Sequence, residues 1–238
     1  MNLPDKGENA MKIITVVGIR GAGKTTVVES LLRALTDRGL RVGTVKTVFC
    51  PTFHMDKPGS NTYRHTAAGA ALVTAKAETE TTVLYPYPLR PSEILAHYRD
   101  CDWVLCEGDY DLPVARVVAA HGPEDARERI NDRTVAVSGL IANDQDTLDG
   151  LPVLHPQRDI DQLVALLMEK VPDTADLASL DEALNGPDAA LSRDFCARGC
   201  RGHAARKPGV QVFVDGKTIK LTPEQEALLR GWAQEVQA

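Results

Sequence analysis

The sequence predicts an α/β fold in which a mostly parallel sheet lies between helices. From residue 11 to about residue 171, short β-branched runs alternate with amphipathic stretches, which is typical of a parallel sheet covered on both faces. In addition, residues 18–25 read G-I-R-G-A-G-K-T and directly follow an apolar run. That octet in a strand–loop–helix context is a phosphate-binding P-loop, so the fold class is that of a P-loop NTPase.

The individual elements follow from hydrophobic periodicity and from start and stop signals. Strands are expected at residues 12–17, 41–47, 71–75, 81–84, 102–107, 114–119 and 134–141. Helices are expected at residues 24–38, 61–68, 92–99 and 159–170. Residues 151–154 and the helix after them complete the last unit of the sheet, and Pro172 ends the domain.

Three segments make up the expected organisation: a flexible leader over residues 1–10, a nucleotide-binding domain over residues 11–172, and a C-terminal extension over residues 173–238. The extension begins with an acidic helix over residues 173–185 and continues with a basic, cysteine-containing loop. A β-hairpin follows, because Asp215-Gly216 between two alternating runs suits a type I′ turn. A last helix starts near Pro223.

Composition narrows the class of protein. An apolar fraction of 43% is that of an ordinary globular core, and the formal net charge of −6 argues against a sequence-independent nucleic-acid binder. The sequence holds no stretch of the roughly 20 apolar residues that span a bilayer. Five scattered cysteines do not resemble a secreted disulfide framework. We therefore expect a cytoplasmic protein that binds neither nucleic acid nor membrane.

Each residue of the octet has a separate chemical task. Gly18, Gly21 and Gly23 allow turns that aim successive N–H groups at phosphate oxygens. Lys24 adds a positive charge, Thr25 offers a hydroxyl to Mg²⁺, and the following helix points the positive end of its dipole at the anion. The expected nucleotide-binding residues are Gly18, Gly21, Ala22, Gly23, Lys24, Thr25 and Thr26. The alternative, a glycine-rich turn that binds nothing, does not explain the lysine and threonine.

A carboxylate is expected on the other side of the metal ion from Thr25. Glu107 follows the apolar run W-V-L-C at the carboxyl end of a strand, where ligands of open parallel sheets bind. We assign Glu107 to the Mg²⁺ site together with Thr25, and to catalysis. A solvated carboxylate is the alternative, and Asp109 or Asp111 could take its place.

The loop after the second strand holds a second group of polar residues. Asp56 and Gly59 form a D-x-x-G, a spacing with which many GTPases sense the state of the nucleotide. Asp56 is therefore a second catalytic candidate. Without further information, a loop rich in Lys, Asp and Gly is more often an ordinary surface loop.

Four segments in this order resemble the MobB family of molybdopterin-guanine dinucleotide biosynthesis proteins. They are V-V-G-I-R-G-A-G-K-T-T, G-L-R-V-G-T-V-K, H-M-D-K-P-G-S-N-T-Y-R-H-T-A-A-G-A and D-W-V-L-C-E-G. The resemblance covers roughly residues 11–171. It implies a dimeric GTP-binding protein with weak, Mg²⁺-dependent hydrolysis that assists the guanylyltransferase attaching GMP to molybdopterin, with molybdopterin or a molybdoenzyme as a further partner. Asn61 departs from the usual aspartate of the family, and Thr47 from its usual histidine.

Guanine preference rests on this resemblance, because the sequence holds no N-K-x-D. Asn143 and Asp144 follow the strand at residues 134–141, a position suited to a base-edge contact, although a simple turn is the favoured interpretation. Hydrolysis is expected to be slow, since no arginine finger or water-positioning glutamine stands in a recognisable motif.

Two other functions stay open. In a small-molecule kinase, Arg127, Arg129 and Arg133 would form a lid over the transferred phosphate, although their acidic neighbours favour a solvated, salt-bridged surface. In a metal or redox carrier, Cys196, Cys200 and His203 would bind Zn or an Fe–S cluster. A fourth ligand is missing, so a loose basic loop is the favoured alternative there.

Overall fold

The computed structural model describes residues 11–50, 53–109, 111–174, 176–182, 212–214 and 217–219. The chain divides into two compact units, Met1–Phe195 and Cys196–Ala238. Among the described residues, no helix is both long and apolar enough to cross a bilayer.

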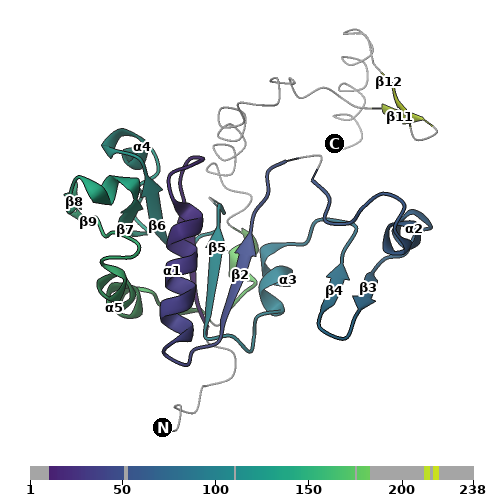
Figure 1. Cartoon of the computed structure of the whole chain (residues 1–238), viewed down its shortest axis with the longest axis horizontal. Coiled ribbons are helices and arrows are strands. Elements are labelled where there is room, and N and C mark those ends of the chain that lie inside the picture. The colour runs from purple at the N-terminus through teal and green to yellow at the C-terminus, as the bar shows by residue number, and fades with distance from the viewer. Residues whose placement is uncertain are drawn as a thin grey trace. The chain divides into compact units, whose positions relative to one another are not determined.

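A parallel sheet forms the centre of the first unit (Figure 1). Its strands are β1 (Met11–Val17), β2 (Val42–Lys46), β5 (Trp103–Glu107), β6 (Ala115–Ala120) and β7 (Thr134–Gly139). Their order is β2-β5-β1-β6-β7, and each neighbouring pair is parallel. The expected α/β class is confirmed. All five carboxyl ends therefore face the same edge of the sheet, which is where the P-loop leaves β1.

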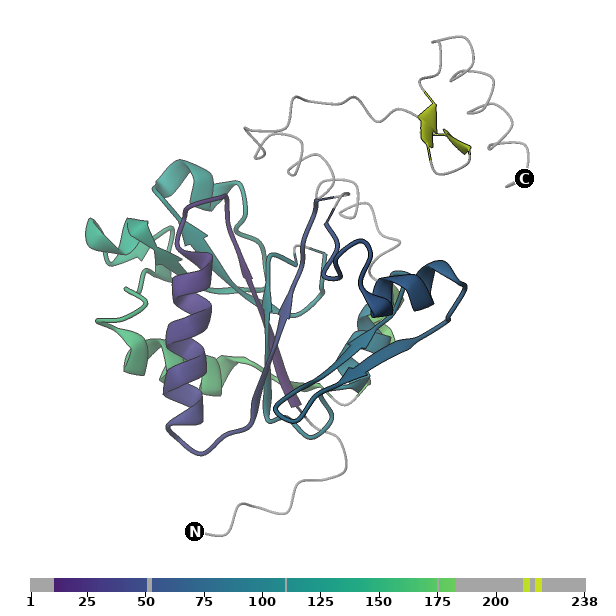
Figure 2. The same ribbon diagram turned by 45° about the vertical axis from the view of Figure 1, so that its right-hand side comes forward.

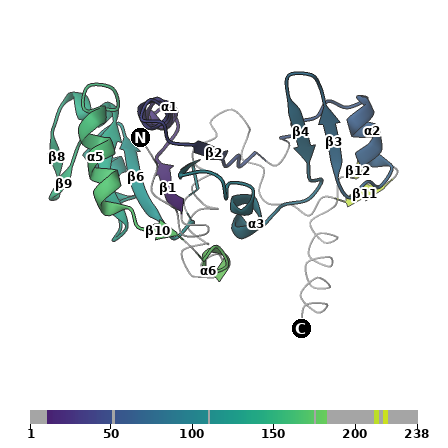
Figure 3. The ribbon, with the colours of Figure 1, turned by 90° about the horizontal axis from the view of Figure 1, so that it is seen from below.

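Helices cover both faces of the sheet, as Figure 3 shows for α1 and α5 against α3 and α6. The helices are α1 (Lys24–Thr36), α3 (Pro91–Ala96), α4 (Pro123–Arg127), α5 (Ile160–Lys170) and α6 (Ser179–Glu182). Strand β1 supplies apolar side chains to both layers, because successive residues point to opposite faces. Ile14 packs in the cluster formed with α1 and α5, whereas Ile13 packs with Leu95 and Leu180 of α3 and α6.

The segment between β2 and α3 leaves the sheet (Figure 2). It contains α2 (Asn61–Ala67), β3 (Val73–Lys76) and β4 (Thr81–Leu84). The sequence places β3 and β4 correctly but wrongly includes them in the parallel run. They pair antiparallel with each other as a separate two-stranded sheet, because four residues between two short strands allow a hairpin but no crossover helix.

The end of β7 also differs from expectation. The strand stops at Gly139, and Leu140–Asn143 form a 3-10 turn, η1, because Gly139 adopts φ 90°. The next two short strands, β8 (Thr147–Leu148) and β9 (Leu151–Pro152), make a small hairpin. Val153 then forms an isolated parallel bridge to Val137, and Leu154 N–H donates to the Val137 carbonyl at 3.0 Å.

The first unit continues past the boundary expected at residue 172. Strand β10 (Asp173–Thr174) pairs antiparallel with β1, where an acidic helix is expected. In the described part of that segment, residues 173–174 and 176–182, only Ser179–Glu182 is helical, and Leu180 is buried. Helix α3 also ends at Ala96, three residues earlier than expected.

The second unit contains the expected hairpin, with β11 (Val212–Val214) antiparallel to β12 (Lys217–Ile219). The expected leader, the basic loop and the last helix lie outside the described residues.

Candidate functional site

The loop between β1 and α1 has the backbone that its glycines predict. Gly18, Gly21 and Gly23 all adopt positive φ angles, of 154°, 80° and 95°. At two glycines beside this turn, Gly18 and Gly139, there is no space for a Cβ atom. A Cβ on Gly18 would lie 2.1 Å from the Ala119 carbonyl oxygen, and one on Gly139 would lie 2.2 Å from that of Ala22. The turn therefore fits between the ends of β6 and β7.

Helix α1 begins at this turn with open N–H groups. Its first helical hydrogen bond runs from Val27 N–H to the Gly23 carbonyl at 3.0 Å, and no side chain caps its start. The amides of Lys24, Thr25 and Thr26 thus precede the first donor of the helical series. Such amides and the positive end of a helix dipole form an anion site.

Lys24 closes back over the loop, with its ammonium donating to the carbonyls of Gly18 and Ile19 at 2.8 and 2.7 Å. Burial lowers the pKa of Lys24, and the charges of Lys46 and Arg129 lower it further, while Glu107 raises it. A cation in such surroundings is stabilised by an added anion, which is what a phosphate supplies.

Thr25 and Glu107 meet, as the sequence predicts. The Thr25 hydroxyl donates to Oε1 of Glu107 at 3.0 Å, and Glu107 is 8% exposed. Hydroxyl and carboxylate oxygens beside a phosphate cradle suit Mg²⁺, which is bound in proteins by few oxygen ligands together with substrate phosphates. These two side chains would hold the ion, which would neutralise phosphate charge.

Lys46 also reaches this carboxylate. Its Nζ lies 2.6 Å from Oε1 of Glu107. The sequence gives no direct sign of the pairing between Lys46 and Glu107. The register explains the contact, since Lys46 and Glu107 are the last residues of β2 and β5 and stand opposite each other. Aligning the ends of the expected strands could have revealed it.

Asp56 makes only local contacts among the described residues. Its Oδ1 accepts from the Ser60 hydroxyl at 2.7 Å and from the Lys57 amide at 2.8 Å. The hydrogen bond from Ser60 is the main reason why the pKa of Asp56 is lowered. Ser60 in turn caps α2 through Tyr63 N–H. The structure thus joins Asp56 to the start of α2 and not, in the described part of the chain, to Thr25 or Glu107.

Asp109, an alternative to Glu107, is held differently. The Thr15 hydroxyl donates to the Asp109 carbonyl at 2.6 Å, and its carboxylate accepts from Leu112 N–H at 3.3 Å. Burial raises the pKa of Asp109.

The three arginines of the kinase hypothesis do not share one environment. Arg127 forms the expected exposed ion pair, with Asp149 at 2.8 Å. Arg129 corrects the solvated interpretation, because its side chain is 3% exposed and donates to the Asp125 carbonyl. The guanidinium is covered where the short helix α4 packs on β6. A charge pattern alone does not reveal such burial, since the neighbouring acids suit a surface equally well.

His121 is a further neighbour of the loop that sequence reasoning missed. It directly follows β6, and its Nε2 lies 3.5 Å from the position of a Cβ on Gly21. The sequence could have pointed to His121, because it is the first polar residue after a buried strand.

A polar cavity of about 590 Å³ lies at the end of β7. Its polar lining includes Asn143, Asp144, Gln145, Asp146, Arg158 and Asp159. The cavity begins three residues after Gly139, whose Cα is 3.4 Å from a Cβ placed on Gly23 of the loop. The structure thus brings Asn143 and Asp144 to a cavity at the same edge as the phosphate cradle.

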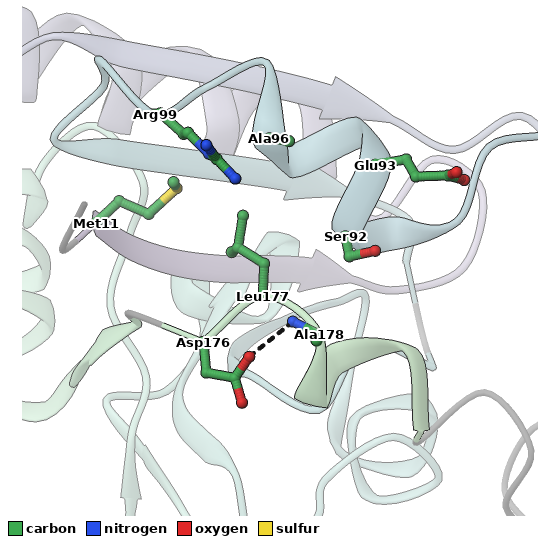
Figure 4. A pocket seen from close by; sticks show the side chains of 8 residues that line it. All are labelled: Met11, Ser92, Glu93, Ala96, Arg99, Asp176, Leu177 and Ala178. Atoms are coloured by element: carbon green, nitrogen blue, oxygen red, sulfur yellow. Dashed lines mark hydrogen bonds between the residues drawn. The ribbon is translucent and has the colours of Figure 1, made fainter. Parts of the chain in front are cut away.

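A second cavity, of about 400 Å³, lies at the opposite edge of the sheet. Figure 4 shows Met11 at the start of β1, Ser92 and Glu93 on α3, and Leu177 pointing between them. The P-loop leaves the other end of β1, so this cavity is separate from the candidate site.

The remaining metal hypothesis falls outside the described residues, since Cys196, Cys200 and His203 are not among them. Within the described residues, no group of three or more His, Cys, Asp or Glu side chains is arranged to hold a metal ion.

The chain matches a known protein family. Residues 13–141 match the family model of "Molybdopterin guanine dinucleotide synthesis protein B", MobB. The chain belongs to the MobB family. Family membership supports a role in molybdenum cofactor biosynthesis.

Two relatives illustrate the extent of the match. The chain is 29% identical over 133 residues to the "Molybdopterin-guanine dinucleotide biosynthesis adapter protein" of Escherichia coli, which covers 50% of this chain and 74% of that protein. It is 27% identical over 150 residues to a Bacillus subtilis relative, covering 60% of this chain and 84% of the relative. The crystal structure of Bacillus subtilis MobB shares the fold, with a TM-score of 0.53 and 24% identity over 66% of this chain and 98% of that one.

Proposed function

We propose that this MobB-family chain is a GTP-binding adapter in molybdenum cofactor biosynthesis that assists the guanylyltransferase making molybdopterin guanine dinucleotide. The observation that carries the proposal is the meeting of Thr25 and Glu107 at 3.0 Å beside an open helix start. This arrangement offers amide donors, a lysine and a metal side to a Mg²⁺-bound triphosphate.

In this proposal the cavity at the end of β7 receives the base, and its carboxylates favour guanine over adenine. The Watson–Crick edge of guanine presents adjacent N–H donors, which suit a carboxylate, whereas that of adenine presents one donor and one acceptor. Asp144 and Asp146 are exposed, and within the described residues their carboxylates make no hydrogen bond or ion pair. These acceptors at the same edge as the P-loop favour GTP over ATP.

Hydrolysis is slow in this proposal. Glu107 would act on the metal side and orient water, with Asp56 as the second candidate. Asp56 would have to exchange its bonds to Ser60 and Lys57 before contacting nucleotide. Arg127 and Arg129 are engaged by Asp149 and by the Asp125 carbonyl, which argues against a kinase lid built from them.

We further propose that the chain acts as a homodimer in the cytoplasm. Its partner is the guanylyltransferase, and molybdopterin or a molybdoenzyme is a further partner. The insertion surface supports association. We define it by the exposed apolar residues between β2 and α3: Val48, Phe49, Phe53, Met55, Tyr63, Leu72, Val83 and Tyr87. The concentration of eight exposed large apolar side chains on one segment of the chain supports an interaction site there.

Binding and turnover of GTP and ATP by the purified full chain test the nucleotide proposal. Wild type should bind GTP more tightly than ATP, Lys24→Ala should lose affinity for both, and Asp146→Asn should lose the preference. Lys170→Ala, on the surface end of α5, is the matched lysine control. Equal affinity for GTP and ATP in wild type would contradict the guanine assignment, and rapid phosphate transfer to a small acceptor would contradict the adapter.

Association is tested by light scattering of wild type and of the pair Val83→Lys and Tyr87→Lys. Wild type should be a dimer and the pair a monomer that still binds GTP. A monomeric wild type at micromolar concentration would refute the dimer without affecting the nucleotide site.

A further inference from the structure

Lys46 occupies an unusual position for a strand lysine. Its ammonium lies 2.6 Å from Oε1 of Glu107, the same oxygen that accepts the Thr25 hydroxyl at 3.0 Å. The Glu107 side chain is 10% exposed, but that of Lys46 is 52% exposed. The carboxylate is thus fixed in the floor of the site, whereas the lysine reaches it from the open side.

The position of Lys46 conflicts with a metal ion at Thr25 and Glu107. An ammonium and Mg²⁺ on one carboxylate oxygen would repel each other strongly in a pocket with few other negative charges. Either the Lys46 ammonium or Mg²⁺ can neutralise the Glu107 carboxylate. The two cations can lie side by side only when an added anion offsets their mutual repulsion. The triphosphate is such an anion.

The surroundings leave Lys46 room to move. The Lys46 side chain is half exposed, and even a Cβ on Gly108, next to Glu107, would meet Lys46 Nζ only at an ordinary contact distance of 3.8 Å. Lysine is a flexible point charge that can change partners at little cost.

We propose that Lys46 holds Glu107 in the nucleotide-free protein and transfers to the terminal phosphate when the Mg²⁺-bound triphosphate arrives. The transfer rests on the proposed nucleotide function, but the competition with metal at Glu107 does not. Lys46 thereby makes metal binding conditional on nucleotide: the free protein excludes the ion, and the complex takes up both together. Lys46 would thus bind the terminal phosphate in the complex and block metal binding at Glu107 in the free protein.

The first test measures Mn²⁺ binding to the full chain without nucleotide, by electron paramagnetic resonance. Lys46→Met should bind Mn²⁺ at least about fivefold more tightly than wild type, the factor that corresponds to releasing a partly exposed ion pair. Lys46→Arg keeps the charge and should behave as wild type. Lys12→Met is the matched control, because Lys12 is also a strand lysine beside a carboxylate, Asp173 at 3.5 Å, but at the other end of the sheet.

The second test measures GTP binding in the absence of divalent metal. Lys46→Met should bind metal-free GTP more weakly than wild type, because Glu107 then repels the phosphates without compensation. Adding Mg²⁺ should restore more affinity to the variant than to wild type. Circular dichroism checks that the variant is folded, and Lys46→Gln serves as a second neutral variant.

Equal Mn²⁺ affinity of wild type and both neutral variants would overturn the proposal and leave Lys46 as a static partner of Glu107. If wild type binds no GTP while the Mn²⁺ difference is observed, the nucleotide function fails and the competition stands. If GTP binds and the Mn²⁺ difference is absent, the nucleotide function stands and the competition at Glu107 fails.

Discussion

The sheet and the insertion between β2 and α3 differ sharply in how they are stabilised. Strand β5 is buried along its whole length, and β1 and β6 nearly so. Helix α2 has no buried residue, and in β3 and β4 only Val73 is buried. Eight of the ten exposed large apolar side chains in the described residues belong to the insertion surface.

This contrast shows that burial determines which residues occupy the sheet but not which residues occupy the insertion. The sheet positions the phosphate cradle through close backbone contacts, so its residues are fixed by packing. The insertion obtains little stability from its own side chains, so its apolar residues are better explained by association. We therefore expect mutations in the sheet to change stability and mutations in the insertion to change the proposed association.

The largest effect is expected at the junction of the loop with β6. Gly18→Ala places a Cβ 2.1 Å from the Ala119 carbonyl oxygen at a φ of 154°. We expect a loss of more than about 3 kcal/mol in the free energy of unfolding, together with loss of GTP binding. Urea denaturation measures the first and calorimetry the second. Gly59→Ala is the control, because it has a positive φ but nothing within 4 Å, and a milder effect of Gly18→Ala than of Gly59→Ala would contradict the packing argument.

Truncation of apolar side chains compares the two regions directly. Leu31→Ala in α1 removes a side chain that is 0% exposed and should cost about 2–5 kcal/mol. Val83→Ala in β4, at 45% exposure, should change the stability of the monomer by about 0.5 kcal/mol or less. Thermal unfolding at low protein concentration measures both. A large cost for Val83→Ala in a monomeric sample would show that the insertion has a core of its own.

The pH dependence of anion binding tests the electrostatics of the cradle. Because the pKa of free Lys24 is lowered from 10.5 and a bound phosphate raises it, binding takes up a proton above the lowered pKa. The contribution of Lys24 to the affinity for tripolyphosphate should be constant below that pKa and fall by about tenfold per pH unit above it, starting before pH 10.5. Lys24→Met should bind weakly and lose this part of the pH dependence. An unchanged alkaline slope in Lys24→Met would assign the titration to another group.

The smallest effect is expected at Asp109, and its sign is stabilising. Burial raises the pKa of Asp109 above 3.8, so the unfolded state releases its proton first and stability falls as pH rises through the folded pKa. Asp109→Asn should therefore gain about 1 kcal/mol at pH 7 and lose this advantage near pH 3. Denaturation at both pH values measures the difference. A destabilised variant at pH 7 would mean that the ionised carboxylate has favourable partners.

Local patterns predicted the parts of the site that depend on chain order. The octet specifies the turn and the helix start, because glycine spacing and the lysine–threonine pair act within a few residues. Glu107 was found because a carboxylate after a buried strand must lie at the carboxyl edge, beside Thr25. The roles of Asp56 and of the Cys196 loop stay predictions, since the first has local contacts only and the second lies outside the described residues.

The sequence by itself determined the α/β class, the glycine-rich turn before α1 and the family, since all three depend on short-range patterns. Only the tertiary structure decided that β3 and β4 leave the sheet, that β10 joins β1, that Arg129 is buried, and that Lys46 holds Glu107. Strand pairing, burial and ion pairing join residues far apart in the chain, and the free energy that selects among such contacts depends on packing. Lys46 and Glu107 are 61 residues apart in the sequence, and the register of β2 on β5 brings them into contact.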